Sequence, residues 1–291
     1  MRAYLGCVLA LILGCPTLPA AAEPFASGAS ERILDIGGIP LHVYAYKPPE
    51  YRAGDILLVL HGLGRNAAGY RQYAKPLAHR YGFLVIAPLF DRQRFPTWRY
   101  QQGGIARATD DAVQAEPEDR WVSSTVNQLI EEVRRAEGAP SLPYSILGHS
   151  AGAQALTRYA AFGTTQARRL IIANPSTYLW PASDVRFPYG LGGLPSELAN
   201  DAVLRRYLAL PIVVLLGTAD VRRDRDLNVT PGAARQGASR HERGLNYFRA
   251  GERLAHGRGW PFGWRLIEVP GVGHSARLMF DSEAAASAFA D

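Results

Sequence analysis

One serine in this chain of 291 residues lies between two glycines, in the stretch GHSAG at residues 148–152. The apolar residues 144–147 before it predict a strand, and the residues from Ala151 onward predict a helix. A serine at the tip of such a turn presents its hydroxyl to a substrate, while Gly148 and Gly152 let the chain turn tightly and the helix approach the strand. The pattern predicts that Ser150 is a nucleophile. A glycine-rich bend without chemistry is the alternative.

A serine nucleophile needs a base, and the base needs an acid that orients it. His274 lies in a glycine-bounded loop, residues 269–275 (VPGVGHS), directly after the last predicted strand. Asp220 ends the stretch IVVLLGTAD at residues 212–220, and Asp224 and Asp226 follow closely as alternative acids. The order Ser150, Asp220, His274 is the one expected of a nucleophile elbow.

The oxyanion formed when a carbonyl is attacked needs backbone donors. The N–H of Ala151, directly after the serine, is one candidate, and that of Leu63 in His61-Gly62-Leu63-Gly64 is the other. Gly62 and Gly64 allow the Leu63 amide to turn inward, and we expect His61 to brace this loop by hydrogen bonding. His149, beside the serine, is expected to point away from it and to pack.

Strands and helices alternate along most of the chain, which predicts an α/β fold with a doubly wound, mostly parallel sheet. An antiparallel hairpin is expected at its edge, from residues 33–35 and 41–46. The other strands are expected at residues 56–60, 83–87, 144–147, 170–173, 212–216 and 265–269. Helices are expected at residues 67–81, 118–137, 151–162, 197–208, 240–256 and 282–290.

Two irregular stretches, residues 89–115 and 174–195, leave from the carboxyl ends of predicted strands and are expected to form pocket walls. Aromatic residues gather in them. Each one singly is expected to pack within its loop, whereas as a group they suggest an apolar acyl or aryl site. These aromatics are Phe90, Phe95, Trp98, Tyr100, Tyr178, Trp180, Phe187 and Tyr189.

The HGLG loop, the GHSAG elbow, LLGTAD and GVGH together make the chain resemble the α/β-hydrolase family from about residue 33 to its end. The resemblance implies an eight-stranded, mostly parallel sheet and a triad of Ser150, His274 and Asp220. It also implies an oxyanion hole from Leu63 and Ala151, and no cofactor. Many members carry a helical cap between the sixth and seventh strands, where this chain has about 40 residues with one expected helix. A short or absent cap, and a relatively open pocket, are therefore expected.

Residues 1–22 are predicted to be a signal peptide, because Arg2 precedes an apolar run at residues 8–13 and small residues precede Glu23. Ile12-Leu13-Gly14-Cys15 also resembles a bacterial lipobox, in which Cys15 would carry lipid, and an uncleaved segment is a third reading. Both main readings predict export, to the periplasm or the medium. Residues 23–291 are expected to form one domain that has no cysteine and no transmembrane span.

The formal net charge of +6 does not predict nucleic-acid binding, because the arginines are scattered and only two lysines occur. The run VRRDRD at residues 221–226 is expected to be a solvated, self-paired loop. The sequence contains neither a metal-binding motif such as HExxH nor a dinucleotide-binding GxGxxG after a strand.

These features predict an exported serine hydrolase that cleaves carboxylic esters, small or polymeric, through an acyl-enzyme on Ser150. A polyester depolymerase, a lipase or a peptidase on the same fold remains open. A binding protein on a hydrolase fold without chemistry is the alternative of another class. The sequence leaves the oligomeric state open.

Overall fold

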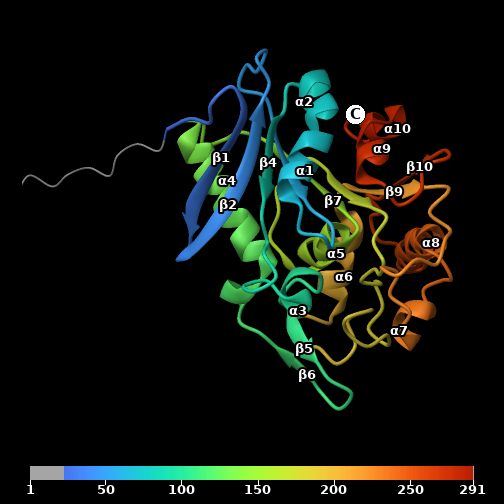
Figure 1. Cartoon of the computed structure of the whole chain (residues 1–291). Helices are drawn as coiled ribbons and strands as arrows, with labels where there is room; N and C mark the ends of the chain where they lie inside the picture. Colours follow the sequence, from blue (N-terminus) through green and yellow to red (C-terminus); the bar gives the residue numbers. More distant parts are fainter. Residues whose placement is uncertain (1–22, 291) are drawn as a thin grey trace, which may run out of the picture.

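The structure of the chain, a computed structural model, describes residues 23–290. The predicted signal segment with Cys15 lies outside the described residues. Eight strands form one sheet in the order β1-β2-β4-β3-β7-β8-β9-β10 (Figure 1). They are β1 (Gly28–Ile36), β2 (Ile39–Lys47), β3 (Ile56–Leu60), β4 (Leu84–Pro88), β7 (Tyr144–His149), β8 (Leu170–Ala173), β9 (Ile212–Gly217) and β10 (Arg265–Val269).

The pairing of these strands follows their apolar patterns. Neighbours from β4 to β10 are parallel, whereas β1 and β2 form an antiparallel hairpin that joins β4 at the edge. The hairpin turns at Gly37 and Gly38, both at positive φ, which favours glycine. The predicted α/β class with a mostly parallel sheet is confirmed.

Each central strand is buried on both faces. In β3, Ile56, Leu58 and Leu60 belong to one apolar core, whereas Leu57 and Val59 belong to the other. Strand side chains alternate between faces, so a continuous apolar run is what a sheet covered on both sides requires.

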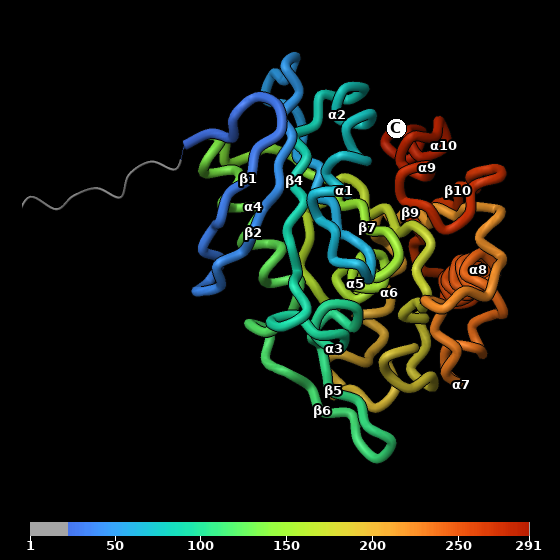
Figure 2. Tube along the Cα trace, in the orientation of Figure 1, coloured from blue at the N-terminus to red at the C-terminus, as the bar shows by residue number. Residues whose placement is uncertain are grey.

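Two helical layers cover the sheet (Figure 1). Helices α4 (Val122–Ala136), α5 (Ala151–Phe162), α6 (Asp201–Ala209) and α8 (Arg240–Arg258) contribute to the first core, and α1 (Ala67–Tyr73), α2 (Lys75–Tyr81), α9 (Ala276–Phe280) and α10 (Glu283–Ser287) to the second. Figure 2 follows the chain from α1 to α9, which pack together although they are far apart in sequence. The rings of Tyr70 and Phe280 lie 6.0 Å apart at this contact. No helix within residues 23–290 is long and apolar enough to cross a membrane.

Some expected helices differ from those in the structure. The helix expected at residues 67–81 is interrupted at Ala74, because Pro76 has no N–H to continue the helical ladder. The helix expected at 118–137 begins as a separate 3₁₀ turn, Glu118–Arg120, before the extended residue Trp121. The expected C-terminal helix at 282–290 shortens to α10, and α9 before it was not expected.

The two irregular stretches follow β4 and β8. The first contains α3 (Thr97–Tyr100) and a small hairpin of β5 (Ala106–Ala108) and β6 (Val113–Ala115), while the second has no helix or strand. Only α6 stands between β8 and β9, so the cap is short, and α7 (Pro231–Ala234) precedes α8.

Five of the eight aromatic residues pack in the core, as expected of each one singly, so the apolar acyl or aryl site that they suggest as a group is largely wrong. At most 1% of the surface is exposed in these five, namely Phe90, Phe95, Tyr100, Tyr178 and Phe187. They anchor the two stretches to the core and therefore offer little surface to an acyl or aryl group.

Candidate active site

Ser150 lies at a strained turn between β7 and α5. Its φ of 56° and ψ of −116° are unusual for a residue with a side chain. The turn persists because its flanks pack tightly. A Cβ on Gly148 would lie 2.6 Å from the Gly152 carbonyl oxygen, and one on Gly152 would lie 2.2 Å from that of Leu60. Both glycines are therefore required for α5 to approach β7 and β3.

His274 lies between Ser150 and Asp220. Its Nε2 is 3.0 Å from Ser150 Oγ, and its Nδ1 is 2.7 Å from Asp220 Oδ2. A carboxylate only accepts hydrogen bonds, so Nδ1 carries the proton and Nε2 directs a lone pair at the hydroxyl. This arrangement can take the serine proton during nucleophilic attack.

Hydrogen bonds between two loops position the acid and the histidine. The N–H of Thr218 donates to Val269 O at 3.1 Å, and that of Ala219 donates to Val272 O at 3.0 Å. Gly217, the last residue of β9, makes this approach possible, because a Cβ there would lie 2.3 Å from Val272 O. The turn after β9, which carries Asp220, and the loop after β10, which carries His274, are therefore fixed relative to each other.

Asp220 is buried, with 2% of its surface exposed. Its second oxygen, Oδ1, accepts a hydrogen bond at 3.3 Å from Nη1 of Arg240, whose side chain is fully buried at the start of α8. The acid thus contacts His274 on one oxygen and a cation on the other. A buried carboxylate needs such partners, because burial without them is costly.

The two alternative acids are not brought to His274. Asp224 accepts two hydrogen bonds from Arg240, at 2.7 and 2.8 Å, and this cation holds the pKa of Asp224 at about 2. Asp226 is exposed, and its N–H donates to Asp224 Oδ1. Residues 221–226 are exposed, as expected of a solvated loop, but little of the loop is self-paired. Only the pair Arg225–Asp226, at 3.8 Å, forms within it, because Asp224 turns inward to Arg240.

The loop after β3 lies against the serine. A Cβ on Gly62 would be 3.5 Å from Ser150 Cβ and 2.6 Å from the hydroxyl of Tyr70. A Cβ on Gly64 would meet nothing within 4 Å, so that glycine is not required sterically. Within residues 23–290 neither Leu63 nor Ala151 donates its N–H to another residue. Ala151 is the first residue of α5, where helical N–H groups lack intrahelical acceptors.

His61 is buried under this loop. Its Nε2 accepts from the N–H of Phe90 at 3.0 Å, and its Nδ1 donates to Gly62 O at 3.0 Å. Burial above all lowers its pKa to about 4, so the ring is neutral near pH 7. Tyr100 donates its hydroxyl hydrogen to His61 O at 2.7 Å. These bonds tie the loop after β3 to the stretch after β4.

His149 is buried beside His274, and their ring centroids lie 4.8 Å apart. Its Nδ1 is 2.9 Å from the hydroxyl of Tyr70. Burial first, and then electrostatic repulsion from His274 and Arg240, lowers the pKa of His149 well below its ordinary value. A neutral ring therefore packs against the base from the side of α1.

Sequence reasoning missed Arg240 and Tyr70, and it assigned Tyr100 to the aromatic group of the irregular stretches and not to the support of His61. A signal for Arg240 existed, because the buried residues of α8 recur at helical spacing and begin with Arg240 and Arg243. An arginine in phase with the buried face of a helix indicates a buried cation. No local pattern indicates that Tyr70 would contact His149, which lies 79 residues away.

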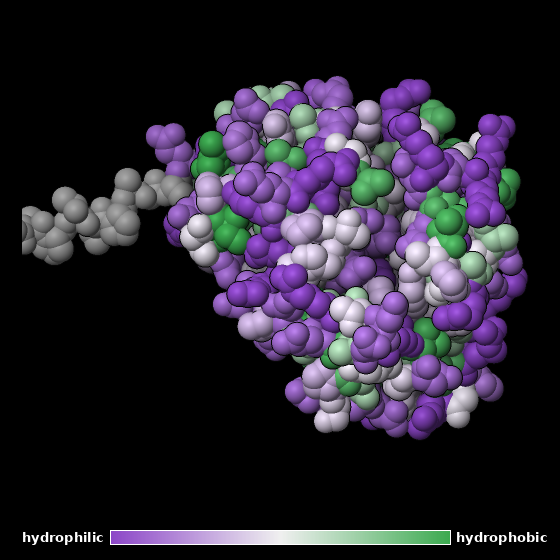
Figure 3. Space-filling model, turned by 60° about the horizontal axis from the view of Figure 1, so that its bottom comes forward, coloured by the Kyte–Doolittle hydropathy of each residue, from purple (hydrophilic) through white to green (hydrophobic). Residues whose placement is uncertain are grey.

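Figure 3 brings forward the side of the molecule that carries α3, β5 and β6, which is predominantly hydrophilic and hollowed near its middle. A cavity of about 630 Å³ lies beside the loop after β3 and is lined by Arg65, Leu89, Asp91, Arg92, Gln93 and Arg94. Arg92 donates to Leu63 O at 2.9 Å, and Arg65 donates to the carbonyls of Phe90 and Phe95. Neither of these two arginines forms an ion pair within the described residues, so the cavity is cationic.

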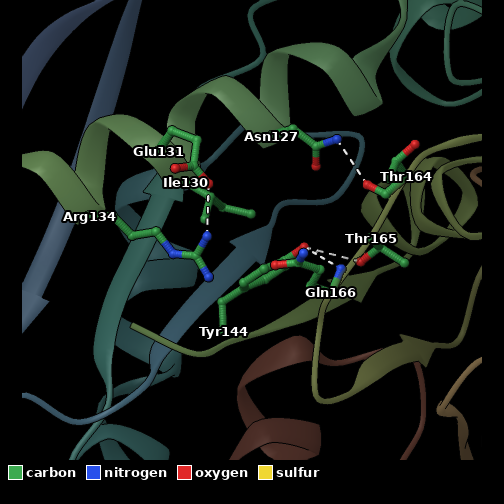
Figure 4. Close-up of a pocket in the computed structure, with 8 residues that line it drawn as sticks. All are labelled: Asn127, Ile130, Glu131, Arg134, Tyr144, Thr164, Thr165 and Gln166. Atoms are coloured by element: carbon green, nitrogen blue, oxygen red, sulfur yellow. Dashed lines mark hydrogen bonds and ion pairs between the residues drawn. The ribbon is translucent and has the colours of Figure 1, made fainter. Parts of the chain in front are cut away.

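A second cavity, of about 190 Å³, lies at the opposite end of the sheet, where β7 begins (Figure 4). Its polar groups bond to each other: Asn127 donates to Thr164 O, Arg134 to Glu131, and Tyr144 lies 3.2 Å from Thr165. Because these polar groups already have partners, the cavity gives no indication of a bound ligand. Residues 23–290 contain no group of three or more His, Cys, Asp or Glu residues able to hold a metal ion.

Two of the solved structures that match this chain are similar to it over nearly their whole length. LpqC, a poly(3-hydroxybutyrate) depolymerase from Bordetella parapertussis, is 31% identical, with 91% of each chain covered and a TM-score of 0.81. Poly(aspartic acid) hydrolase-1 from Sphingomonas sp. KT-1 is also 31% identical, with 90% of this chain and 98% of that one covered and a TM-score of 0.81. No protein-family model and no curated protein matches this chain.

Proposed function

This chain belongs to the α/β-hydrolase family and is a hydrolase, and from this premise we propose that it cleaves carboxylic esters through an acyl-enzyme formed on Ser150. One observation carries the proposal: a continuous line of hydrogen bonds from Ser150 Oγ through both nitrogens of His274 to Asp220. A serine, a histidine and a carboxylate in this order can perform acyl transfer.

In the proposed reaction Ser150 Oγ attacks the carbonyl carbon while its proton passes to His274 Nε2. Asp220 stabilises the imidazolium that forms. The negative charge on the carbonyl oxygen is bound by the N–H groups of Leu63 and Ala151, each worth about 10²- to 10³-fold in rate. His274 then protonates the leaving alkoxide. Water attacks the acyl-enzyme in the same way, with His274 as base, and releases the acid.

A fluorophosphonate probe tests the nucleophile, because it labels an activated serine covalently. Labelling and hydrolysis of p-nitrophenyl esters are both expected in the wild type and absent in Ser150→Ala. Ser196→Ala, which alters an exposed serine, is the matched control and should keep both. A wild-type protein that is not labelled would overturn the proposal and favour a binding protein without chemistry.

A panel of substrates separates the remaining candidates by acyl-chain length, by polymer film and by bond type. A lipase prefers long acyl chains, and a small-molecule esterase prefers short ones. A polyester depolymerase erodes a polyester film, whereas a peptidase cleaves a peptide amide. The names of both matched proteins refer to polymers, and the short cap leaves room for a polymer chain to lie across the hollowed face.

A second candidate is hydrolysis of a polymer that bears carboxylates. The cationic cavity favours it, because Arg65 and Arg92 have no acidic partner in the described part of the chain and could pair with substrate carboxylates. Parallel assays on poly(3-hydroxybutyrate) and poly(aspartic acid), each at low and high salt, decide between them. Faster cleavage of poly(aspartic acid), suppressed by salt, would favour this candidate.

Export also belongs to the proposal and rests on the sequence of residues 1–22. Mass spectrometry of the mature protein distinguishes its forms. A mature chain beginning at Glu23 indicates a cleaved signal peptide, whereas a lipid on Cys15 indicates a membrane anchor.

A further inference from the structure

Arg240 is a fully buried cation that contacts two carboxylates. Nη1 reaches Asp220 Oδ1 at 3.3 Å and Asp224 Oδ2 at 2.8 Å, while Nη2 reaches Asp224 Oδ1 at 2.7 Å. Asp220 also holds His274. A single guanidinium therefore joins the acid of the site to a carboxylate on the surface loop, of whose side chain 40% is exposed.

Two features of this placement are unfavourable for a cation. Arg240 is the first residue of α8, where the helix dipole already presents positive charge, and its Nε has no hydrogen-bond partner. Arg243, one turn later, is equally buried but donates only to carbonyl oxygens, of Gly237, Ser176 and Asn228. Arg243 joins loops together, whereas Arg240 alone brings its charge to the proposed catalytic residues.

The groups around His274 come from several elements. Asp220 follows β9, Ser150 precedes α5, and His149 ends β7 with a neutral ring against that of His274. Arg240 of α8 and Asp224 of the loop after β9 complete the charged set. With His274 neutral, Asp220, Arg240 and Asp224 together carry a net charge of −1.

Resting on the proposed function, we propose that Arg240 and Asp224 are positioning residues that act through Asp220 to set the pH range in which His274 is a free base. The positive charge of Arg240 offsets the negative charge of Asp220, and the negative charge of Asp224 in turn offsets that of Arg240. The imidazolium of His274 is thus stabilised by one net negative charge instead of two.

Charge removal at the two positions has opposite consequences. Arg240→Gln leaves a net charge of −2, which stabilises imidazolium, so the acidic limb of the pH profile moves to higher pH. Asp224→Asn leaves a net charge of zero, which destabilises imidazolium, so the limb moves to lower pH. Each shift should be about one pH unit, as a nearby charge produces. The double variant restores −1 and should return the limb towards its wild-type position.

The experiment measures the rate constant for fluorophosphonate labelling of Ser150 between about pH 4 and pH 9 in wild type, both single variants and the double variant. Arg258→Gln is the matched control, since it removes an arginine of the same helix from an exposed pair with Asp201. We expect its midpoint to equal that of the wild type. Asp224→Asn keeps the test decisive if Arg240→Gln does not fold, because Asp224 is partly exposed.

Failure of this inference differs from failure of the proposed function. A wild type that is not labelled refutes the function. A labelled wild type whose variants keep the same midpoint, or shift in the same direction, refutes the role of Arg240 and Asp224. Opposite shifts with recovery in the double variant support it, and a purely structural role would not produce them.

Discussion

Gly152→Ala tests whether the elbow depends on the close approach of α5 to β3. The new Cβ would lie 2.2 Å from Leu60 O, 2.6 Å from Leu60 C and 2.8 Å from Leu60 Cβ. Two of these atoms are backbone atoms of β3, which is hydrogen-bonded on both sides within the sheet. The strain must therefore be relieved by moving α5, and Ser150, directly before α5, moves with it.

The magnitude follows from two opposing effects. Alanine is favoured over glycine in a helix by up to about 1 kcal/mol. Overpacking a core costs about 1–3 kcal/mol, and contacts this short with backbone belong at the upper end. The net loss should be about 1–2 kcal/mol, or roughly 2–8 °C in Tm for a chain of this size. A displaced Ser150 should also be labelled about 10- to 100-fold more slowly by a fluorophosphonate.

Thermal unfolding and the labelling rate measure both effects. The control is Gly257→Ala, the same substitution at an exposed position of α8, where a Cβ meets nothing within 4 Å. This control should be as stable as the wild type or more stable by about 0.5 kcal/mol, with an unchanged labelling rate. A Gly152→Ala protein that keeps its Tm and its labelling rate would refute the steric argument.

Two further predictions concern stability. His61 has a pKa of about 4 when folded and about 6.5 when unfolded, so the unfolded chain binds more protons between these values and stability falls as the pH is lowered through them. The stability advantage of the wild type over His61→Gln should shrink by about 3 kcal/mol from pH 7 to pH 4 in urea unfolding, and a constant difference would contradict the buried neutral ring. Lys47→Met should cost about 2 kcal/mol in the same assay at pH 7, because Glu137, whose side chain is 6% exposed, loses the cation 2.6 Å away and keeps only the N–H of Phe25 as a partner among the described residues. Recovery of stability in Lys47→Met with Glu137→Gln is expected, and its absence would show that the packing of the lysine matters more than its charge.

The strands and the helix around Ser150 could be predicted because their signals are local. Continuous apolar runs mark strands buried on both faces, and the helix expected at residues 151–162 has the bounds of α5. Breaks such as the one at Ala74 were less visible, since one proline divides an otherwise continuous helical pattern.

The surroundings of the site depended on contacts between distant segments. Whether Tyr100 lines a pocket or packs under His61 is decided by how the stretch after β4 folds back, which no local pattern records. Asp224 could be named as an alternative acid from its position alone. Its actual partner, Arg240, lies 16 residues later and became visible only with α8 in place.

The proposed base lies 124 residues after the proposed nucleophile, beyond β10, which pairs only with β9 at the sheet edge. Chains are synthesised from the amino terminus, and earlier parts can fold first. Ser150 is therefore synthesised well before His274. A chain clipped before His274 would keep the proposed nucleophile and lose its proposed base.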